Sequence, residues 1–298
     1  MRSPVTTAGV DRRGQVAVVL GAANGLGLGL ARRFGLDGAR LVLADIAAPA
    51  LSAVQEEMLA AGMDVVACQT DISDASQVDA LVRLALEHHG RIDLVCNAVG
   101  VSGHDQHRIW ELPEEDWRWV FDVNVWGVLN VIRSFTSVLI DAGRGHIVNT
   151  ASSITFSSRG GYAPYDASKH AVLSLCETLA HELAAMGSSV RSSVLIPGAI
   201  RSRLYDSELN RQPQYGQGVT TEEQREDMRV YLEQHGADPD MLAEIVDSQI
   251  AEGRFYVFGR AEDLAYAEAK LDEVRAGFLR ATNFRRRSGP GSVAPGDR

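Results

Sequence analysis

Tyr165 and Lys169 have the residue types and the spacing of a proton-transfer pair. They follow Pro164, which suits the first turn of a helix, and residues four apart share a helix face. An ammonium about 5 Å from a phenol, at an effective dielectric of about 20, favours the phenolate by about 3 kcal/mol, or roughly two pKa units. The spacing also arises by chance. If functional, it predicts a tyrosine that acts as general acid and base at a carbinol or carbonyl oxygen.

Ser152 could assist this pair. It precedes Tyr165 by 13 residues and follows the apolar run His146–Thr150. Ligands of open parallel sheets bind at the carboxyl ends of strands, so a hydroxyl at this point could hold a substrate oxygen. Ser153 is the competing candidate, and a structural loop serine is the plainer interpretation.

Asn124 lies on the apolar stripe of a helix expected over Glu114–Leu139. A buried amide without partners costs about 1–3 kcal/mol, so this side chain must be hydrogen-bonded. It is either a satisfied core residue or the anchor of a water that carries protons to Lys169.

A glycine-rich turn near the N-terminus has the features of a pyrophosphate site. The apolar run Val16–Leu20 leads directly into the turn and then into a helix, whose free N–H groups and partial positive charge attract phosphates. Glycines let the backbone approach the ligand closely. The spacing is GxxxGxG rather than GxGxxG, and the turn reads Gly21-Ala22-Ala23-Asn24-Gly25-Leu26-Gly27.

Asp45 ends the second apolar run and is followed by Ile46. An acidic residue near this offset from the glycines accepts hydrogen bonds from ribose hydroxyls and repels a 2′-phosphate. Two charges about 4 Å apart at a dielectric of about 20 interact by about 4 kcal/mol. The residue therefore predicts NAD rather than NADP, unless it only caps the next helix.

These residues require a sheet to position them. Near-continuous apolar runs alternate with longer amphipathic stretches, which predicts a doubly wound parallel α/β sheet of the Rossmann type. The seven expected strands are Val16–Leu20, Arg40–Asp45, Asp64–Gln69, Ile92–Cys96, His146–Thr150, Val190–Ile196 and Phe255–Phe258.

We expect a single domain over residues 14–283, between a disordered leader (1–13) and a disordered tail (284–298). The segment 201–253 is long for a loop in a compact fold and predicts a substrate lid. It carries helical patterns over Thr221–Gln234 and Asp238–Ile250, and a further helix is expected over Ala261–Arg280.

Composition excludes several classes of protein. The net charge of −10 argues against nucleic acid as a partner. Cys68, Cys96 and Cys176 show neither a disulfide nor a metal pattern, so we expect no metal. No apolar run approaches the ~20 residues that cross a bilayer, and the N-terminus resembles no secretory signal. A cytoplasmic protein without membrane partners is expected.

Taken in order, these motifs resemble the short-chain dehydrogenase/reductase family. Besides those above, the set includes Asp71-Ile72, Cys96-Asn97-Ala98 and Pro197-Gly198. The resemblance implies Tyr165 as acid/base, Ser152 polarising a carbonyl, Lys169 on the nicotinamide ribose and Asn124 on a relay water. It also implies cofactor contacts from Asp71, Ile72, Asn97, Ala98, Pro197, Gly198, Ile200 and Ser202, and a homodimer or homotetramer.

The sequence departs from the family pattern at Leu20, Cys96 and Val99, whereas Ser202 keeps the hydroxyl of a common threonine. The long segment 201–253 is similar to a branch that oxidises bulky aryl alcohols. Candidate pocket residues are Ile154, Phe156, Tyr162, Ile200, Leu204 and Tyr205.

The leading hypothesis is an NAD-dependent dehydrogenase of a hydrophobic secondary alcohol. An NADPH-linked carbonyl or 3-oxoacyl reductase is the alternative among enzymes. A dinucleotide sensor without turnover is the alternative from another class.

Overall fold

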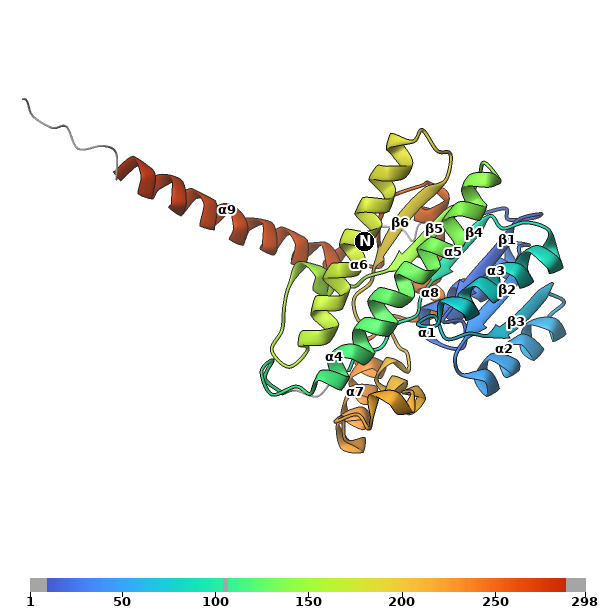
Figure 1. Cartoon of the computed structure of the whole chain (residues 1–298), viewed down its shortest axis with the longest axis horizontal. Helices are drawn as coiled ribbons and strands as arrows, with labels where there is room; N and C mark the ends of the chain where they lie inside the picture. Colours follow the sequence, from blue (N-terminus) through green and yellow to red (C-terminus); the bar gives the residue numbers. More distant parts are fainter. Residues whose placement is uncertain (1–9, 104–106, 288–298) are drawn as a thin grey trace, which may run out of the picture.

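The computed structural model describes residues 10–103 and 107–287 and is built on one parallel sheet (Figure 1). The strand order is β3-β2-β1-β4-β5-β6-β7, with all pairs parallel. This confirms the expected doubly wound fold. The strands are β1 Val16–Leu20, β2 Arg40–Asp45, β3 Val65–Gln69, β4 Leu94–Asn97, β5 His146–Thr150, β6 Arg191–Ile196 and β7 Tyr256–Phe258.

Helices cover both faces of the sheet because alternate residues of each buried strand point to opposite sides. In β1, Ala17 and Val19 pack into one apolar cluster, whereas Val16, Val18 and Leu20 pack into another. The first cluster joins the sheet to α1 (Gly25–Leu36), α2 (Ala48–Ala60) and α8 (Pro239–Ala251). The second joins it to α3 (Ala75–His89), α5 (Gly127–Asp141) and α6 (Ala163–Ala185).

The expected helix over Glu114–Leu139 is continuous but not uniform. It consists of α4 (Glu114–Phe121), a π-helical turn η1 (Asp122–Trp126) and α5. Its 28 residues, 114–141, are long and apolar enough to cross a bilayer when length and composition are the only criteria. The helix nevertheless packs Val131, Phe135 and Leu139 into the core, as a central helix of a globular domain does.

The predicted lid is divided in the structure. Its first part contains the short helices η3 (Leu204–Asn210) and η4 (Pro213–Tyr215), followed by α7 (Glu222–His235). Its last part is α8, which is a layer of the core rather than a lid. A Cβ on Gly29 of α1 would lie 2.5 Å from the carbonyl oxygen of Pro239, so the glycine permits this close packing. Helical periodicity predicted α8 correctly but could not assign it to the sheet.

Two expected boundaries need correction. Arg12 is buried and forms an ion pair with Asp247 of α8, so ordered structure begins before residue 14. The helix expected to end at Arg280 continues as α9 (Leu264–Arg287), past the predicted start of the tail at residue 284. The rest of the leader, 1–9, and of the tail, 288–298, lies outside the described residues.

Candidate active site

A cavity of about 710 Å³ opens at the carboxyl ends of the strands and collects most of the predicted site residues. It is lined by Gly21, Asn24, Gly25, Leu26, Gly27, Asp45, Ile46, Asp71, Ile72, Ala98, Ser152, Ile154, Tyr162, Tyr165, Lys169, Pro197, Gly198, Ile200, Ser202, Leu204 and Tyr205. Asn97, Asn124 and Phe156 are the predicted residues that do not line it.

The glycine-rich turn is packed as a phosphate-binding turn requires. Gly21 has φ +79°, and a Cβ on Gly27 would lie 2.1 Å from the carbonyl oxygen of Gly21. A Cβ on Gly25 would lie 2.8 Å from Cβ of Ser202. Asn24 is the N-cap of α1, but its side chain makes no capping bond and instead accepts the backbone N–H of Arg203 at 3.2 Å. The first N–H groups of α1 are therefore not capped by this side chain.

The Asp45 carboxylate is hydrogen-bonded to the backbone on both sides of the strand end. One carboxylate oxygen accepts the backbone N–H of Ala23 at 3.0 Å, and the other accepts that of Ala47, the N-cap of α2, at 3.0 Å. The residue is 8% exposed and lines the cavity beside Ile46. Each oxygen keeps a second lone pair, so the carboxylate can still accept from a ligand hydroxyl.

Asp71 connects this end of the cavity to residues 204–215, here called the lid segment. Its carboxylate accepts from the backbone N–H and the hydroxyl of Ser73, at 2.9 and 2.7 Å, and from the side-chain amide of Gln212. The lid segment therefore reaches across the cavity to Asp71.

Asn97 does not line the cavity, and its side chain is hydrogen-bonded within the protein; its cofactor contact stays a prediction. Its amide donates to Asn149 at 3.1 Å, and its side-chain oxygen accepts the N–H of Val99 at 3.2 Å. The Asn97 carbonyl accepts from the hydroxyl of Thr150 at 2.8 Å. Being 1% exposed, the side chain positions the backbone of β4 and β5.

The three catalytic candidates, Ser152 just after β5 and Tyr165 and Lys169 in α6, line the same cavity. Hydrogen bonding by the Ser152 side chain lowers the pKa of the Tyr165 phenol, and Nζ of Lys169 lies 5.7 Å from the centroid of the Tyr165 ring. Nζ also donates to the carbonyl of Thr150 at 2.9 Å. Ser152 is thereby distinguished from Ser153, which also lines the cavity.

The electrostatics of the pair differ from the expectation. Burial raises the pKa of Tyr165, and the hydrogen bond with Ser152 acts in the opposite direction. Burial also lowers the pKa of Lys169 to about 8. The predicted lowering of the phenol pKa by Lys169 is therefore not what the protein residues produce, because the same burial that brings the two groups together disfavours both charged forms.

Asn124 lies in the π-helical turn and is fully buried. Its amide donates to the carbonyl of Val101 and to the hydroxyl of Ser168, both at 2.9 Å, and its side-chain oxygen accepts the Val101 N–H at 2.8 Å. These bonds match the satisfied core residue. The relay-water role stays a prediction.

Ser168 is a positioning residue that sequence reasoning missed. It is fully buried, accepts from Asn124 and donates to the backbone carbonyl of Tyr165 at 2.7 Å. It thus connects the π-helical turn to the catalytic tyrosine. A serine inside the Tyr-x-x-x-Lys spacing and on a buried helix face was the available signal.

The substrate side of the cavity lies between η2 (Ser153–Phe156), the start of α6 and the lid segment. Ile154, Tyr162, Leu204 and Tyr205 line it as predicted, whereas Phe156 packs against Phe258, with 6.4 Å between the ring centroids. Further lining residues that sequence reasoning missed include Arg159, Met228, Tyr231 and Tyr266. Three of these come from the lid helix α7 or from α9, whose positions periodicity does not fix.

The lid segment is fastened to α4. Arg211 forms an ion pair with Asp116 in which both side chains are almost fully buried, and it donates to the carbonyl of Tyr215 at 2.6 Å. The Tyr215 hydroxyl donates to Asp122 at 2.8 Å. Arg211 also lies over the ring of Trp119, 4.9 Å from its centroid. These contacts hold residues 204–215 over the cavity.

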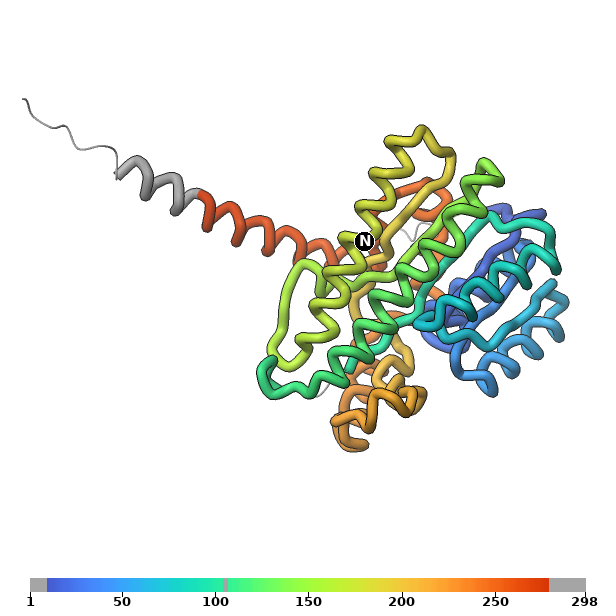
Figure 2. Tube along the Cα trace, viewed as in Figure 1, coloured from blue at the N-terminus to red at the C-terminus, as the bar shows by residue number. Residues whose placement is uncertain are grey.

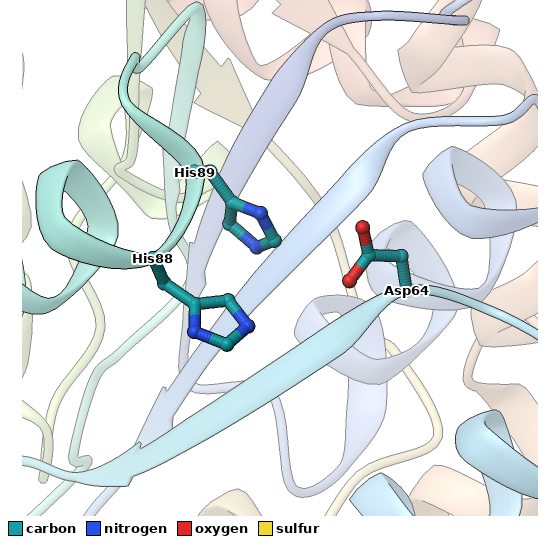
Figure 3. Close-up of side chains that lie close together, drawn as sticks. All are labelled: Asp64, His88 and His89. Atoms are coloured by element: carbon teal, nitrogen blue, oxygen red, sulfur yellow. The ribbon is translucent and has the colours of Figure 1, made fainter.

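A second group of polar side chains lies at the opposite edge of the sheet. Asp64 precedes β3, and His88 and His89 end α3; their potential ligand atoms lie within 4.8 Å of one another (Figure 3). Asp64 and His88 are exposed. Because the cavity lies at the carboxyl ends of the strands, this group takes no part in it.

Comparison with known proteins decides the family. Residues 15–213 match the family model described as short chain dehydrogenase. The chain belongs to the short-chain dehydrogenase/reductase family. It is 37% identical over 250 residues to the 1-deoxy-11-beta-hydroxypentalenate dehydrogenase of Streptomyces avermitilis. The matched region covers 83% of this chain and 84% of the relative.

Solved structures of this family include complexes with either dinucleotide. A short-chain dehydrogenase/reductase from Burkholderia phymatum in complex with NAD is 33% identical, with a TM-score of 0.83 over 90% of this chain and 96% of that one. A metagenomic short-chain oxidoreductase in complex with NADP is also 33% identical, with a TM-score of 0.59 over 64% of this chain and 86% of that one. As a member of the family, the chain is an oxidoreductase that acts on a hydroxyl group.

Proposed function

We propose that this oxidoreductase is an NAD-dependent dehydrogenase that interconverts a hydrophobic secondary alcohol and its ketone. The observation that carries the proposal is the arrangement of Ser152, Tyr165 and Lys169 at the wall of a cavity that begins at the glycine-rich turn. The cavity residues fit a dinucleotide, since an uncapped helix N-terminus meets phosphates at one point and Asp45 accepts hydroxyls at another.

When bound, NAD would accept the hydride and bring a positive charge that favours the Tyr165 phenolate. In oxidation, Tyr165 takes the hydroxyl proton of the alcohol, and in reduction it returns a proton to the carbonyl oxygen. Ser152 donates a hydrogen bond to the same substrate oxygen. Lys169, held by the Thr150 carbonyl, binds the nicotinamide ribose.

The preference for NAD rests on Asp45. Its carboxylate is held by two backbone N–H groups and cannot turn away from the cavity without losing them. A 2′-phosphate at that point would meet an uncompensated negative charge, and Asp71 adds another acid at the same end. This arrangement favours NAD over the alternative of an NADPH-linked reductase.

The substrate class rests on the walls next to Tyr165. Ile154, Leu204 and Met228 are apolar, and Tyr162, Tyr205 and Tyr231 present rings. The relatives named 1-deoxy-11-beta-hydroxypentalenate dehydrogenase act on a hydroxyl of a pentalenate, which agrees with a bulky alicyclic alcohol here. A dinucleotide sensor is less favoured because Tyr165 and Lys169 are both in place. We keep a cytoplasmic location and a homodimer or homotetramer as predictions.

The decisive experiment compares wild type with Tyr165→Phe, using a panel of aryl, alicyclic and aliphatic secondary alcohols. Wild type should form NADH with part of the panel. The variant should lose at least a hundredfold in kcat and keep its affinity for NAD, measured by calorimetry. Full activity of the variant would refute the assignment of Tyr165. NAD binding by wild type without turnover of any alcohol would favour the sensor.

A further inference from the structure

Four cationic side chains line the cavity. Three of them either have a partner in the protein or lie next to the residues predicted to bind the cofactor. Lys169 is held by Thr150 beside Tyr165. Arg203 lies at the glycine-rich turn, through its backbone bond to Asn24. Arg260 pairs with Asp263 at 3.3 Å and lies against Gly198. Arg159 is the cation that remains on the substrate side.

Arg159 belongs to the segment between η2 and α6, which links Ser152 to Tyr165. Its guanidinium carbon lies 3.9 Å from the centroid of the Tyr162 ring, so the ring holds it against the cavity wall. Its positive charge also acts on Tyr205 and Tyr165, opposing the raised pKa that burial gives each phenol. Arg159 therefore shares the cavity with Tyr165 and Tyr205, and its charge favours the phenolate form of both.

Asp166 is the carboxylate of this protein that lies nearest to pairing with the Arg159 guanidinium. One of its oxygens accepts the backbone N–H of Arg159 at 2.8 Å. The other lies 3.9 Å from the guanidinium, beyond hydrogen-bond distance, and has no hydrogen-bond partner among the described residues. Asp227 of α7 also lines the cavity but is exposed. The Arg159 side chain is 48% exposed and lines the cavity, so its guanidinium donors are accessible to a ligand.

We propose that Arg159 binds a carboxylate of the substrate, which makes the substrate a hydrophobic hydroxy acid rather than a neutral alcohol. The inference rests on the proposed function. A guanidinium donates two parallel hydrogen bonds to a carboxylate. Stacking on the Tyr162 ring would fix the plane of the Arg159 guanidinium before the substrate binds. The apolar residues between Arg159 and Tyr165 would hold the carbon skeleton, with the hydroxyl at Tyr165.

The test uses hydroxy acids paired with their methyl esters, because the ester keeps the skeleton and removes the charge. Cholate, lithocholate and 12-hydroxystearate with their esters are suitable probes. Wild type should show a kcat/KM for acids about ten- to a hundredfold above that for esters, mostly through KM. Arg159→Gln should abolish this ratio without lowering activity on esters, and Arg159→Lys should restore part of it. Arg203→Gln, which removes another cation of the cavity, should leave the ratio unchanged.

The outcomes separate this inference from the proposed function. NADH formation with neutral alcohols or esters, and no preference for acids in wild type, would overturn the role of Arg159 and leave the dehydrogenase in place. An equal loss on acid and ester in Arg159→Gln would show a structural role through Asp166. Absence of turnover with acids, esters and the panel of alcohols would refute both.

Helix α9 carries a second, independent inference. It leaves the body of the molecule after its first turns, which pack against η2 (Figures 1 and 2). Leu264, Ala267, Leu271, Val274 and Phe278 follow a three-four spacing and form one stripe, here called the α9 seam. Leu271, Val274 and Phe278 are 49%, 57% and 68% exposed.

The charges along α9 indicate what covers this seam. Within α9, residues 264–273 contain three acidic residues and one lysine, whereas residues 275–287 contain five arginines and no acid. Two copies of α9 paired antiparallel about the middle of the helix would place the acidic first half of each beside the arginine-containing second half of the other, with the Leu271–Phe278 part of the two seams at the crossing. An acidic first half and a basic second half also suit the macrodipole of an unpaired helix. An unpaired α9, however, would leave its apolar seam exposed to water.

We infer that the α9 seam binds α9 of a second copy of this chain about a twofold axis. Light-scattering mass should fall by a factor of two in Leu271→Glu/Phe278→Glu. It should stay unchanged in the control Ala269→Glu/Ala276→Glu, which adds the same charges on the opposite face. High salt should weaken the association of wild type.

An unchanged mass in the seam variant, with helicity retained by circular dichroism, would overturn this interface. So would a wild type that is monomeric. Binding of wild type, but not of the seam variant, to phosphatidylserine vesicles without self-association would assign α9 to a membrane surface instead.

Discussion

Lys169 shows how a residue proposed for catalysis can work against stability. Its ammonium is buried beside Tyr165 with one hydrogen bond, to the Thr150 carbonyl, among the described residues. Burial lowers its pKa to about 8, so the folded state holds its proton less tightly than the unfolded chain does. Ser168 and Asn124 are also buried and polar, but their bonds are complete. The site therefore combines satisfied positioning residues with one under-solvated charge.

Replacing Lys169 should separate activity from stability. Its pKa is about 10.5 in the unfolded chain and about 8 when folded, so below pH 8 the buried charge costs about 3 kcal/mol. Between pH 8 and 10.5 the unfolded state binds more protons, so this cost disappears as pH rises. Lys169→Met should lose activity and gain about 1–3 kcal/mol in free energy of unfolding at pH 7, with the gain shrinking towards pH 10. Denaturant titrations at both pH values measure this.

Lys270→Met is the control, since that lysine is exposed and should change stability little at either pH. A Lys169→Met protein that is markedly less stable than wild type at pH 7 would show that the Thr150 bond outweighs the burial of the charge.

Asp45 should decide cofactor selectivity. Asp45→Asn keeps an oxygen acceptor for one backbone N–H and removes the charge, and Asp45→Ala removes both. Both variants should reduce the ratio of kcat/KM for NAD to that for NADP by at least about tenfold. The alanine variant should also be less stable, through its two unpaired N–H groups. An unchanged ratio in both would place the ribose contact elsewhere.

At the scale of elements, the lid segment (residues 204–215) is held by several polar contacts and by one aromatic side chain in an apolar cluster. Arg211 and Asp116 are almost fully buried, and Gln212 reaches Asp71 across the cavity. Tyr215 inserts into an apolar cluster with Trp119 and Val120. Buried ion pairs specify one geometry but contribute little net stability, because both charges lose their hydration. This contact therefore sets the position of the lid more than the strength of the fold.

A double substitution should distinguish these roles. Arg211→Met alone leaves the Asp116 carboxylate buried without its partner, which costs about 3–5 kcal/mol. Arg211→Met/Asp116→Leu should recover most of this loss in chemical denaturation. Both the single and the double variant should have a higher KM for the cofactor than wild type, because residues 204–215 are no longer held in place against α4. Recovery of both properties would show that the ion pair does not position the lid.

At the scale of the molecule, one cavity spans the carboxyl ends of six strands, β1 to β6, and takes part of its substrate-side wall from the segment 200–235 and from α9. Its two ends come from opposite halves of the sheet, so a bound dinucleotide would tie those halves together. A ligand that binds only the folded state stabilises it according to its concentration over Kd.

NAD at a hundred times its Kd should stabilise the protein by about 2.7 kcal/mol and raise Tm by about 5 °C or more. The same concentration of NADP should give a smaller shift. Tyr165→Phe should keep the NAD shift, because the phenol acts on substrate. Equal shifts with both dinucleotides in thermal unfolding would contradict the selectivity assigned to Asp45.

The amino-acid pattern by itself determined the seven strands, the glycine-rich turn and the positions of Ser152, Tyr165 and Lys169, because short-range periodicity and turn chemistry depend on neighbouring residues. Only the tertiary structure decided that Asn97 supports the backbone, that α8 belongs to the core and that Arg159 lines the cavity. It also reversed the expected pKa shift of Tyr165. Such properties depend on which distant segments meet and how much water they exclude, and a local pattern carries no information about either.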